Sequence, residues 1–292
     1  MTDHVNAVVL GSTGQLGSAC VEVFRAAGFN VTPLSHAEVE IADGGAVRRV
    51  LASYHPDVAV NCAAYVRVND AEDHAEDAFR VNALGALHVA QACAEVNSTC
   101  VYISTDFVFD GEANRSYTEE DVSHPINVYG TSKLAGELLV QQTCPRWLIA
   151  RVASLFGETG SRGKGGNFVD TIVRNAKART PIRVVNDVRM SPTYALDAAK
   201  VLAWLLSHRQ TGVFHLANTG SCTWFEFAQR ITERIGAPTR PEAITSQEYP
   251  SRAPRPRDSS LRSVRLPPEA RTFLRPWQDA LASYCLAKGY TA

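Results

Sequence analysis

Short apolar runs alternate with longer stretches of helical periodicity through the first half of the chain. The runs short enough to be buried strands are residues 5–10, 29–34, 58–63, 99–104 and 147–153. The stretches whose apolar residues recur at helical spacing are residues 18–27, 45–54, 71–96 and 129–142. Because strands separated by helices pair in parallel through crossovers, this order predicts an α/β fold, a doubly wound parallel sheet of the Rossmann type.

The pattern is less regular in the second half. It predicts helices at residues 167–178, 194–206 and 225–235 and strands at residues 182–185 and 212–217. Residues 157–166 contain five glycines and are expected to form a mobile loop, and residues 250–256 form a loop rich in proline and arginine. At 292 residues the chain exceeds one typical domain, which suggests two lobes. In the first half, the long 71–96 helix is expected to bend or break near residues 82–85.

A glycine-rich turn follows the first predicted strand. It reads Gly11-Ser-Thr-Gly14-Gln-Leu-Gly17 and leads directly into a helix and a second strand. Glycines let a backbone approach a pyrophosphate closely, and a helix N-terminus offers free N–H groups to it. The turn therefore predicts a dinucleotide site, although the same spacing also occurs in ordinary strand-to-helix turns.

Tyr129 and Lys133 are four residues apart, which places them on one face of the predicted 129–142 helix. An ammonium group near a phenol favours the phenolate, so we expect the tyrosine pKa to be lowered and Tyr129 to exchange a proton near neutral pH. An exposed helical pair is the alternative interpretation. Ser104-Thr105-Asp106 ends the apolar run that precedes this helix, and it brings further polar side chains to the same edge of the sheet.

Composition narrows the functional class. A net charge of −1 provides no general attraction for nucleic acid or an anionic membrane. No apolar run approaches the ~20 residues of a membrane span, and no secretory signal is visible. The seven cysteines form no C-x-x-C pair and are expected to be reduced thiols in a cytoplasmic protein. The histidines show no metal-binding spacing, so no metal site is expected.

Together these motifs resemble the dTDP-4-dehydrorhamnose reductase family of the extended short-chain dehydrogenases/reductases. The segments that carry the resemblance, in chain order, are Gly11 to Gly17, Asn61-Cys-Ala-Ala-Tyr65, Val81-Asn-Ala83, Ser104-Thr-Asp-Phe-Val-Phe-Asp-Gly111, Tyr129-Gly-Thr-Ser-Lys133, Gly166-Asn-Phe168, Asp187 with Ser191-Pro-Thr193, and Arg255-Pro256 with Ser259 and Leu261. The sequence departs from the family pattern at Asn69, Ser154, Val188 and Met190, in segments that approach the sugar in that family.

The resemblance implies a dinucleotide-binding domain at residues 1–155, to which residues 181–217 return, and a smaller C-terminal substrate-binding lobe at residues 156–180 and 218–292. It implies that the cofactor is held by Gly11, Gly14, Gln15, Leu16, Gly17, Glu40, Ile41, Ala63, Ala64, Tyr65, Tyr129 and Lys133. It implies catalytic roles for Thr105, Tyr129 and Lys133. Substrate contacts are expected from Thr105, Asp106, Asn167 and Arg255.

The implied activity is the NADPH-dependent reduction of a nucleotide-linked 4-keto-6-deoxyhexose in deoxysugar and cell-surface polysaccharide biosynthesis. NADPH is expected because the second strand ends at His36 without an acidic residue before Glu38, and NADH stays open. Two other functions stay open: an epimerase or dehydratase on the same scaffold, and a non-catalytic cofactor-binding regulatory subunit. The partner is a nucleotide sugar, and a homodimer is open.

Overall fold

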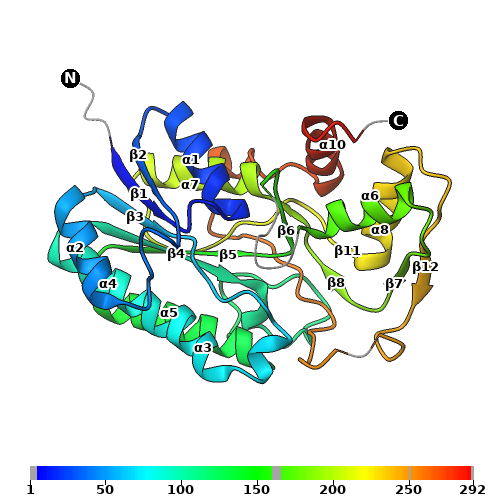
Figure 1. Cartoon of the computed structure of the whole chain (residues 1–292), viewed down its shortest axis with the longest axis horizontal. Helices are drawn as coiled ribbons and strands as arrows, with labels where there is room; N and C mark the ends of the chain where they lie inside the picture. The colour runs from blue at the N-terminus through cyan, green and yellow to red at the C-terminus, as the bar shows by residue number, and fades with distance from the viewer. Residues whose placement is uncertain (1–4, 160–165, 250, 291–292) are drawn as a thin grey trace.

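The computed structural model describes residues 5–159, 166–249 and 251–290, and these form a six-stranded parallel sheet (Figure 1). In spatial order its strands are β2 (Asn30–Leu34), β1 (Asn6–Leu10), β3 (Val58–Asn61), β4 (Thr99–Thr105), β5 (Trp147–Val152) and β10 (Gly212–His215). Every neighbouring pair is parallel. The chain moves from β1 to β2 on one side and to β3 on the other, so the sheet has a topological switch point beside β1.

Helices cover both faces of the sheet. On one face lie α1 (Gln15–Ala26) and α7 (Ala195–Ser207), and on the other lie α2 (Gly44–Tyr54), α4 (Gly85–Glu95) and α5 (Val128–Thr143) (Figure 1). Alternate residues of β1 point to the two layers, because Ala7 and Val9 join the first core while Val8 and Leu10 join the second. The doubly wound α/β sheet predicted from the sequence is confirmed.

The long helix expected at residues 71–96 is divided into several pieces. A 3-10 turn at Asp70–Glu72 precedes α3 (Ala75–Phe79), and a π-helical turn at Arg80–Leu84 separates α3 from α4. This π turn falls where a bend was expected. Such turns widen a helix locally and occur often at functional sites, and here the turn contains the buried Asn82.

A second lobe packs around its own apolar core. It contains α6 (Phe168–Lys177), α8 (Trp224–Arg234) and α10 (Trp277–Ala287), with β7 (Arg183–Val185) paired to β12 (Glu242–Ile244) and β8 (Arg189–Met190) paired to β11 (Cys222–Thr223). The predicted helices at residues 167–178 and 225–235 correspond to α6 and α8. Each begins at a side-chain cap, Asn167 for α6 and a Thr223–Glu226 capping box for α8. The sequence pattern did not predict α10.

The expected division of the chain into lobes stays a prediction. The packing supports placing residues 182–190 with the second lobe, because Ile182, Val184 and Met190 join its core. The chain then returns to the sheet through α7 and β10. Between the lobes, β6 (Leu155–Phe156) pairs with β9 (Thr193–Tyr194), and a short helix, α9 (Pro268–Arg271), packs beside α7. Of the glycine-rich loop at residues 157–166, residues 160–165 lie outside the described residues.

Residues 251–261 run from the second lobe across to the first, and we call them the strap. Asn127 Nδ2 donates a hydrogen bond to the carbonyl oxygen of Pro254 at 2.9 Å. The hydroxyl of Ser259 donates to Asp106, and Leu261 bridges to Tyr117. The strap therefore fixes second-lobe residues against the loops that follow the sheet.

Candidate active site

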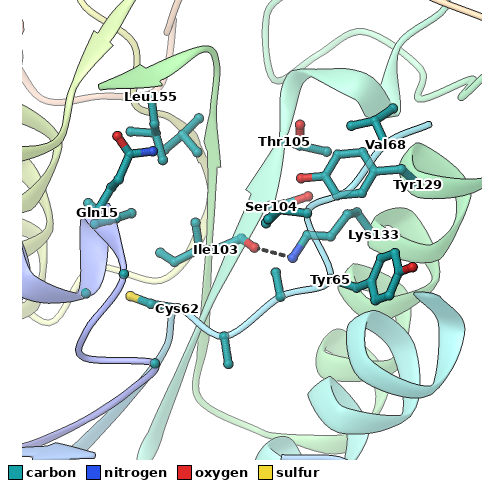
Figure 2. A pocket seen from close by; sticks show the side chains of 18 of the residues that line it. Gln15, Cys62, Tyr65, Val68, Ile103, Ser104, Thr105, Tyr129, Lys133 and Leu155 are labelled. Atoms are coloured by element: carbon teal, nitrogen blue, oxygen red, sulfur yellow. Dashed lines mark hydrogen bonds between the residues drawn. The ribbon is translucent and has the colours of Figure 1, made fainter. Parts of the chain in front are cut away.

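A cavity of about 650 Å³ opens at the carboxyl ends of β1, β3 and β4, beside the switch point. Side chains from both lobes line it. Figure 2 shows Gln15, Cys62 and Leu155 on one side of this cavity, with Thr105, Tyr129, Lys133 and Tyr65 on the other. Ligands of open α/β sheets bind in this position, so the cavity is the candidate active site.

The glycine turn brings the backbone close to the cavity. Gly11 has a positive φ of 72°, and a Cβ at this position would lie 2.7 Å from the backbone nitrogen of Ala63. At Gly17, a Cβ would lie 2.2 Å from the carbonyl oxygen of Gly11. Gly14 precedes α1 and provides no side-chain cap, so the first N–H groups of this helix stay free for an anion. Gly11, Gly14, Gln15, Leu16 and Gly17 all line the cavity, and this cradle fits a pyrophosphate.

Two polar atoms that line the cavity are buried without a hydrogen-bond partner. They are Oε1 of Gln15 and Oγ of Ser104. A buried polar atom without a partner costs about 1–3 kcal/mol, so such atoms indicate a site completed by a ligand. Together with the glycine cradle, they show that the residues present fit a dinucleotide. Within the described residues, no cluster of three His, Cys, Asp or Glu side chains is arranged to hold a metal ion.

Glu40 and Ile41 also line the cavity, at the end beyond β2. Glu40 Oε1 accepts a hydrogen bond from the backbone N–H of Ala42 at 3.0 Å, and its other oxygen lies 3.4 Å from Nδ1 of His36. The predicted contacts of these two residues with the cofactor stay predictions. His36 lines the cavity as well and is exposed, so it faces the same end of the site.

The strand expected at residues 58–63 ends earlier, at Asn61, because the following residues turn away to line the cavity. Ala63, Ala64 and Tyr65 form this turn. Asn82 fixes it, since its side chain accepts from the backbone N–H of Tyr65 at 2.9 Å and donates to the Tyr65 carbonyl at 3.1 Å. Asn82 also donates to Ser132 of α5 at 3.0 Å. The π turn thus ties the cavity wall to the helix that carries Tyr129 and Lys133.

Lys133 is buried, with 2% of its surface exposed. Its ammonium group donates a hydrogen bond to the Ile103 carbonyl at 2.6 Å, the dashed line in Figure 2. It also lies 4.1 Å from the centre of the Tyr102 ring. Burial lowers the pKa of Lys133 to about 7, and the charge of Glu137 acts in the opposite direction. Lys133 therefore loses its proton, and with it its charge, more readily than an exposed lysine does.

The expectation that the Tyr129 pKa is lowered is wrong for this structure. Burial raises the pKa of Tyr129 to about 12, the neighbouring Thr105 side chain opposes the rise, and the Asp106 charge adds to it. Lys133 does not lower it here, because its ammonium group is directed to the Ile103 carbonyl. Tyr129 packs edge-on against Phe107, with ring centres 5.9 Å apart.

Thr105 and Asp106 lie where β4 ends, beside Tyr129. Thr105 Oγ1 donates to Asp106 Oδ1 at 3.0 Å and accepts from the backbone N–H of Phe107 at 3.2 Å. The other carboxylate oxygen of Asp106 accepts from Ser259 Oγ at 2.5 Å. Burial raises the pKa of Asp106 to about 6, although both hydrogen bonds favour the ionised form. The structure thus brings the predicted catalytic residues Thr105, Tyr129 and Lys133 to one cavity wall.

Asn167 lines the cavity, but its side chain is engaged within the protein. Its Nδ2 donates to the Gly157 carbonyl at 3.1 Å and to the Tyr284 hydroxyl at 2.9 Å, and its Oδ1 caps α6. Both donor hydrogens are used, so a direct contact between this amide and a substrate needs one of these bonds to break. The predicted substrate contact of Asn167 stays a prediction, and its role here is to hold α6, α10 and residue 157 together.

Arg255 reaches the cavity from the strap. Its guanidinium group lies 5.4 Å from the centre of the Phe107 ring. Nη2 donates to Asn69 Oδ1 at 2.9 Å, and Nε donates to Ser251 Oγ at 3.2 Å. Among the residues that the structure describes, no carboxylate forms an ion pair with Arg255. Its charge is therefore held in place by neutral groups at the open end of the site.

The structure adds an aromatic wall that the sequence pattern did not reveal. Phe168, Trp224 and Phe227 of the second lobe line the cavity, and the rings of Phe168 and Trp224 are 4.7 Å apart. Aromatic residues at the start of an amphipathic helix, such as Trp224, are usually core residues. Only the approach of α6 to α8 shows that one side of this wall faces the cavity.

The four departures from the family pattern have different surroundings. Ser154 lines the cavity in a left-handed conformation, with φ of 43°. Asn69 contacts Arg255. Met190 lies in the second-lobe core, and the Val188 carbonyl accepts from the Trp224 N–H at 3.3 Å. Ser154 and Asn69 are therefore the two departures that can alter what the site binds.

Known proteins share this arrangement. A family model described as "RmlD substrate binding domain" matches residues 5–289. The chain is 37% identical over 277 residues to the dTDP-4-dehydrorhamnose reductase of Mycolicibacterium smegmatis, covering 94% of this chain and 83% of that protein. The chain belongs to this family. The resemblance inferred from its motifs is thus confirmed.

Two further proteins are similar to this chain over nearly its whole length. The spore coat polysaccharide biosynthesis protein SpsK of Bacillus subtilis is 37% identical over 277 residues, 95% of either chain. The crystal structure of dTDP-4-dehydrorhamnose reductase from Bacillus anthracis in complex with NADP superimposes with a TM-score of 0.92 at 32% identity, covering 97% of this chain and 99% of the other. The similarity therefore includes the second lobe as well as the sheet.

Proposed function

We propose that this protein is an NAD(P)H-dependent oxidoreductase that reduces a nucleotide-linked 4-keto-6-deoxyhexose, as the dTDP-4-dehydrorhamnose reductases do. The observation that carries the proposal is a single cavity whose wall holds Thr105, Tyr129 and Lys133, next to a glycine cradle at the N-terminus of α1. The relatives' names and the bound NADP of the Bacillus anthracis structure support the same class. The pathway is deoxysugar and cell-surface polysaccharide biosynthesis.

The chain's own residues hold the cofactor and move the proton. The reduced nicotinamide supplies the hydride when it is bound. Tyr129 donates its phenolic proton to the oxygen of the reacting carbonyl, which becomes a hydroxyl. Lys133 holds the ribose of the cofactor, and its charge, once turned toward that site, stabilises the phenolate that remains. Thr105 orients the reacting oxygen or the phenol. Burial of the site strengthens each of these interactions by excluding water.

The other two functions are less well supported. A non-catalytic subunit has no need for Thr105, Tyr129 and Lys133 together at the wall of one cavity. An epimerase or dehydratase uses a similar pair but regenerates its cofactor in each turnover. Net consumption of NADPH therefore separates a reductase from both alternatives.

The decisive experiment supplies a panel of nucleotide 4-keto-6-deoxyhexoses with NADPH or NADH and follows the loss of nicotinamide absorbance. We expect stoichiometric oxidation with at least one sugar. Tyr129→Phe should lower kcat by roughly 10²–10⁴-fold, because it removes the transferred proton, while cofactor Kd stays close to wild type. Exposed Tyr54→Phe is the control. Full activity in Tyr129→Phe, or cofactor that is never consumed, would refute the proposal.

The cofactor preference, the cellular location and the oligomeric state are proposals as well. We expect NADPH to be preferred, because the three residues that follow β2 include no acid, although Glu38, which is bound to Ser35, and Glu40, at that end of the cavity, limit the preference. In the described part of the chain, no helix is long and apolar enough to cross a membrane. A cytoplasmic location fits the nucleotide substrate, and a homodimer stays open.

A further inference from the structure

A buried carboxylate joins the strap to the catalytic wall. Asp106 is 3% exposed and accepts one hydrogen bond from each lobe, from Thr105 on β4 and from Ser259 on the strap. Ser259 is itself 2% exposed. Delivery of a proton by Tyr129 does not by itself require this carboxylate, and burying it has a cost, because burial disfavours the ionised form.

The Thr105 hydroxyl has two neighbouring oxygens to which it could donate its hydrogen, one on Asp106 and one on Tyr129. A threonine hydroxyl has one hydrogen to donate and two lone pairs that accept. That hydrogen is directed to Asp106 Oδ1 at 3.0 Å, and one lone pair accepts from the Phe107 N–H. Figure 2 shows the Tyr129 hydroxyl next to the Thr105 side chain, and Thr105 acts to lower the pKa of Tyr129. Thr105 cannot donate to the carboxylate and to the tyrosine oxygen at the same time.

We propose that Asp106, held by Ser259 of the strap, is a positioning residue that decides whether the Thr105 hydroxyl donates to the carboxylate or to Tyr129. The proposal rests on the proposed reductase function and deepens it. When Asp106 is ionised, it takes the Thr105 hydrogen, and the tyrosine oxygen loses a donor. When Asp106 is protonated, it donates to Thr105, and Thr105 donates to the oxygen of Tyr129.

The two states differ in how readily Tyr129 releases its proton. A hydrogen bond to the phenolate oxygen stabilises it, and a neighbouring negative charge destabilises it. The protonated state of Asp106 therefore makes Tyr129 the stronger acid. Tyr129 on α5 and Arg255 on the strap both face Asp106, and the charge of Arg255 favours the ionised carboxylate. Since Asp106 has a pKa of about 6, the switch lies close to physiological pH.

Ser259 sets the pH at which the switch occurs. Its hydroxyl donates to the ionised carboxylate, so its removal should raise the Asp106 pKa. Because Ser259 belongs to the strap, a displaced strap has the same effect as its removal. The position of the second lobe therefore affects the pKa of Asp106 and, through Thr105, the acidity of Tyr129.

The test measures kcat and KM for the nucleotide 4-keto-sugar between pH 5 and pH 8. In wild type, kcat should fall as pH rises through about 6, with KM nearly constant. Asp106→Asn should lose the step near pH 6, because an amide can donate to Thr105 at every pH, while the change near pH 7 at which Lys133 loses its charge should be common to all variants. Ser259→Ala should move the midpoint to higher pH. Ser260→Ala, the matched control on the same strap, bonds to Ser116 instead and should keep the wild-type profile.

A second pair of variants tests whether Asp106 acts on Tyr129 through the Thr105 hydroxyl or directly through its negative charge. Thr105→Val should flatten the profile, and Thr105→Ser should retain it. A profile in Asp106→Asn that still falls through pH 6, or an unchanged midpoint in Ser259→Ala, overturns the proposal.

A titration without substrate makes the result independent of the reaction. The infrared carboxyl band assigned by its loss in Asp106→Asn should titrate near pH 6 in wild type and at higher pH in Ser259→Ala. If no sugar is reduced but this titration occurs as expected, the reductase function fails while the coupling of strap and carboxyl stands. If Asp106 stays ionised down to pH 4, the switch is refuted whatever the enzyme reduces.

Discussion

Lys133 places an ammonium group in the interior of the protein. It donates a hydrogen bond to the Ile103 carbonyl and lies over the face of the Tyr102 ring. Within the described residues, no carboxylate forms an ion pair with it, and Glu137, one turn further along α5, is bound by Arg151 at 2.7 and 2.9 Å. A buried charge without an ion-pair partner lowers the free energy of unfolding, and such groups occur mainly where function requires them.

The cost of Lys133 can be measured through pH. Its pKa is lowered to about 7 in the folded protein, so between pH 7 and about 10.5 the unfolded chain binds more protons. The contribution of Lys133 to stability should therefore rise with pH across this window, and it is measured as the difference between wild type and Lys133→Met, because the buried cysteines with raised pKa values act in the opposite direction in both proteins. Lys133→Met should lose that rise and be more stable than wild type by a few kcal/mol at pH 6, with turnover abolished.

Urea unfolding at pH 6, 8 and 9.5 checks this prediction, with the exposed Lys200→Met as the control. A Lys133→Met protein that is less stable than wild type at pH 6 would show that the ammonium group contributes to the fold.

At the scale of elements, the first turn of α5 determines where Tyr129 lies. Asn127 caps the helix by accepting from the Gly130 N–H at 2.8 Å, and it also donates to the strap. Gly130 lies against the loop after β4, since a Cβ there would be 2.1 Å from the Phe107 carbonyl oxygen. The absence of a side chain at residue 130 lets α5 approach Thr105 and Asp106 closely.

Gly130→Ala should therefore separate the first turn of α5 from the residues that follow β4. The backbone of Phe107 cannot yield as a side-chain tip can, so we expect a loss of about 1–3 kcal/mol in unfolding free energy and a marked fall in kcat. The helix propensity of alanine alone would act in the opposite direction. Leu138→Ala, on the same helix and 50% exposed, is the control. Urea unfolding and steady-state rates provide the measurement, and a more stable, fully active variant would contradict this account.

At the scale of the whole molecule, the strap brings a cation from the second lobe to a cavity that opens on the sheet. Arg255 and Lys133 supply the Lys and Arg side chains among the described lining residues. Lys133 is deep in the wall, so we propose that Arg255 meets the diphosphate of a nucleotide sugar. Asn69 orients Arg255 without neutralising it, because an amide oxygen accepts its hydrogen bond where a carboxylate would also cancel its charge.

Asn69→Asp should turn this contact into an ion pair. We expect KM for the nucleotide sugar to rise roughly five- to tenfold at low salt, with cofactor Kd unchanged, because the guanidinium would be shared with a protein carboxylate. Arg255→Ala should raise the same KM. In the double variant, the change at residue 69 should have no further effect, which makes the double-mutant cycle its own control. If KM equals the wild-type value in all three variants, the diphosphate is held elsewhere.

Much of the first lobe was predictable from sequence because its signals are local. Each parallel strand is a short apolar run, and each helix has its own periodicity, so β1 to β5 lie close to their predicted residues. The glycine turn and the Tyr129–Lys133 spacing are local signals too. The residues of both motifs line the same cavity, because the carboxyl ends of parallel strands meet at one edge.

Other features were decided by the tertiary structure. The direction of the Tyr129 pKa shift was predicted wrongly from the spacing of Tyr129 and Lys133, because burial and the orientation of the Lys133 ammonium group depend on segments far away in the chain. The pairing of β7 with β12, the position of α10 and the aromatic wall around Trp224 join residues with little local signal. The contact of Ser259 with Asp106 spans 153 residues. The sequence by itself determined which chemical groups this protein has, and folding determined which of them are buried, charged and in contact.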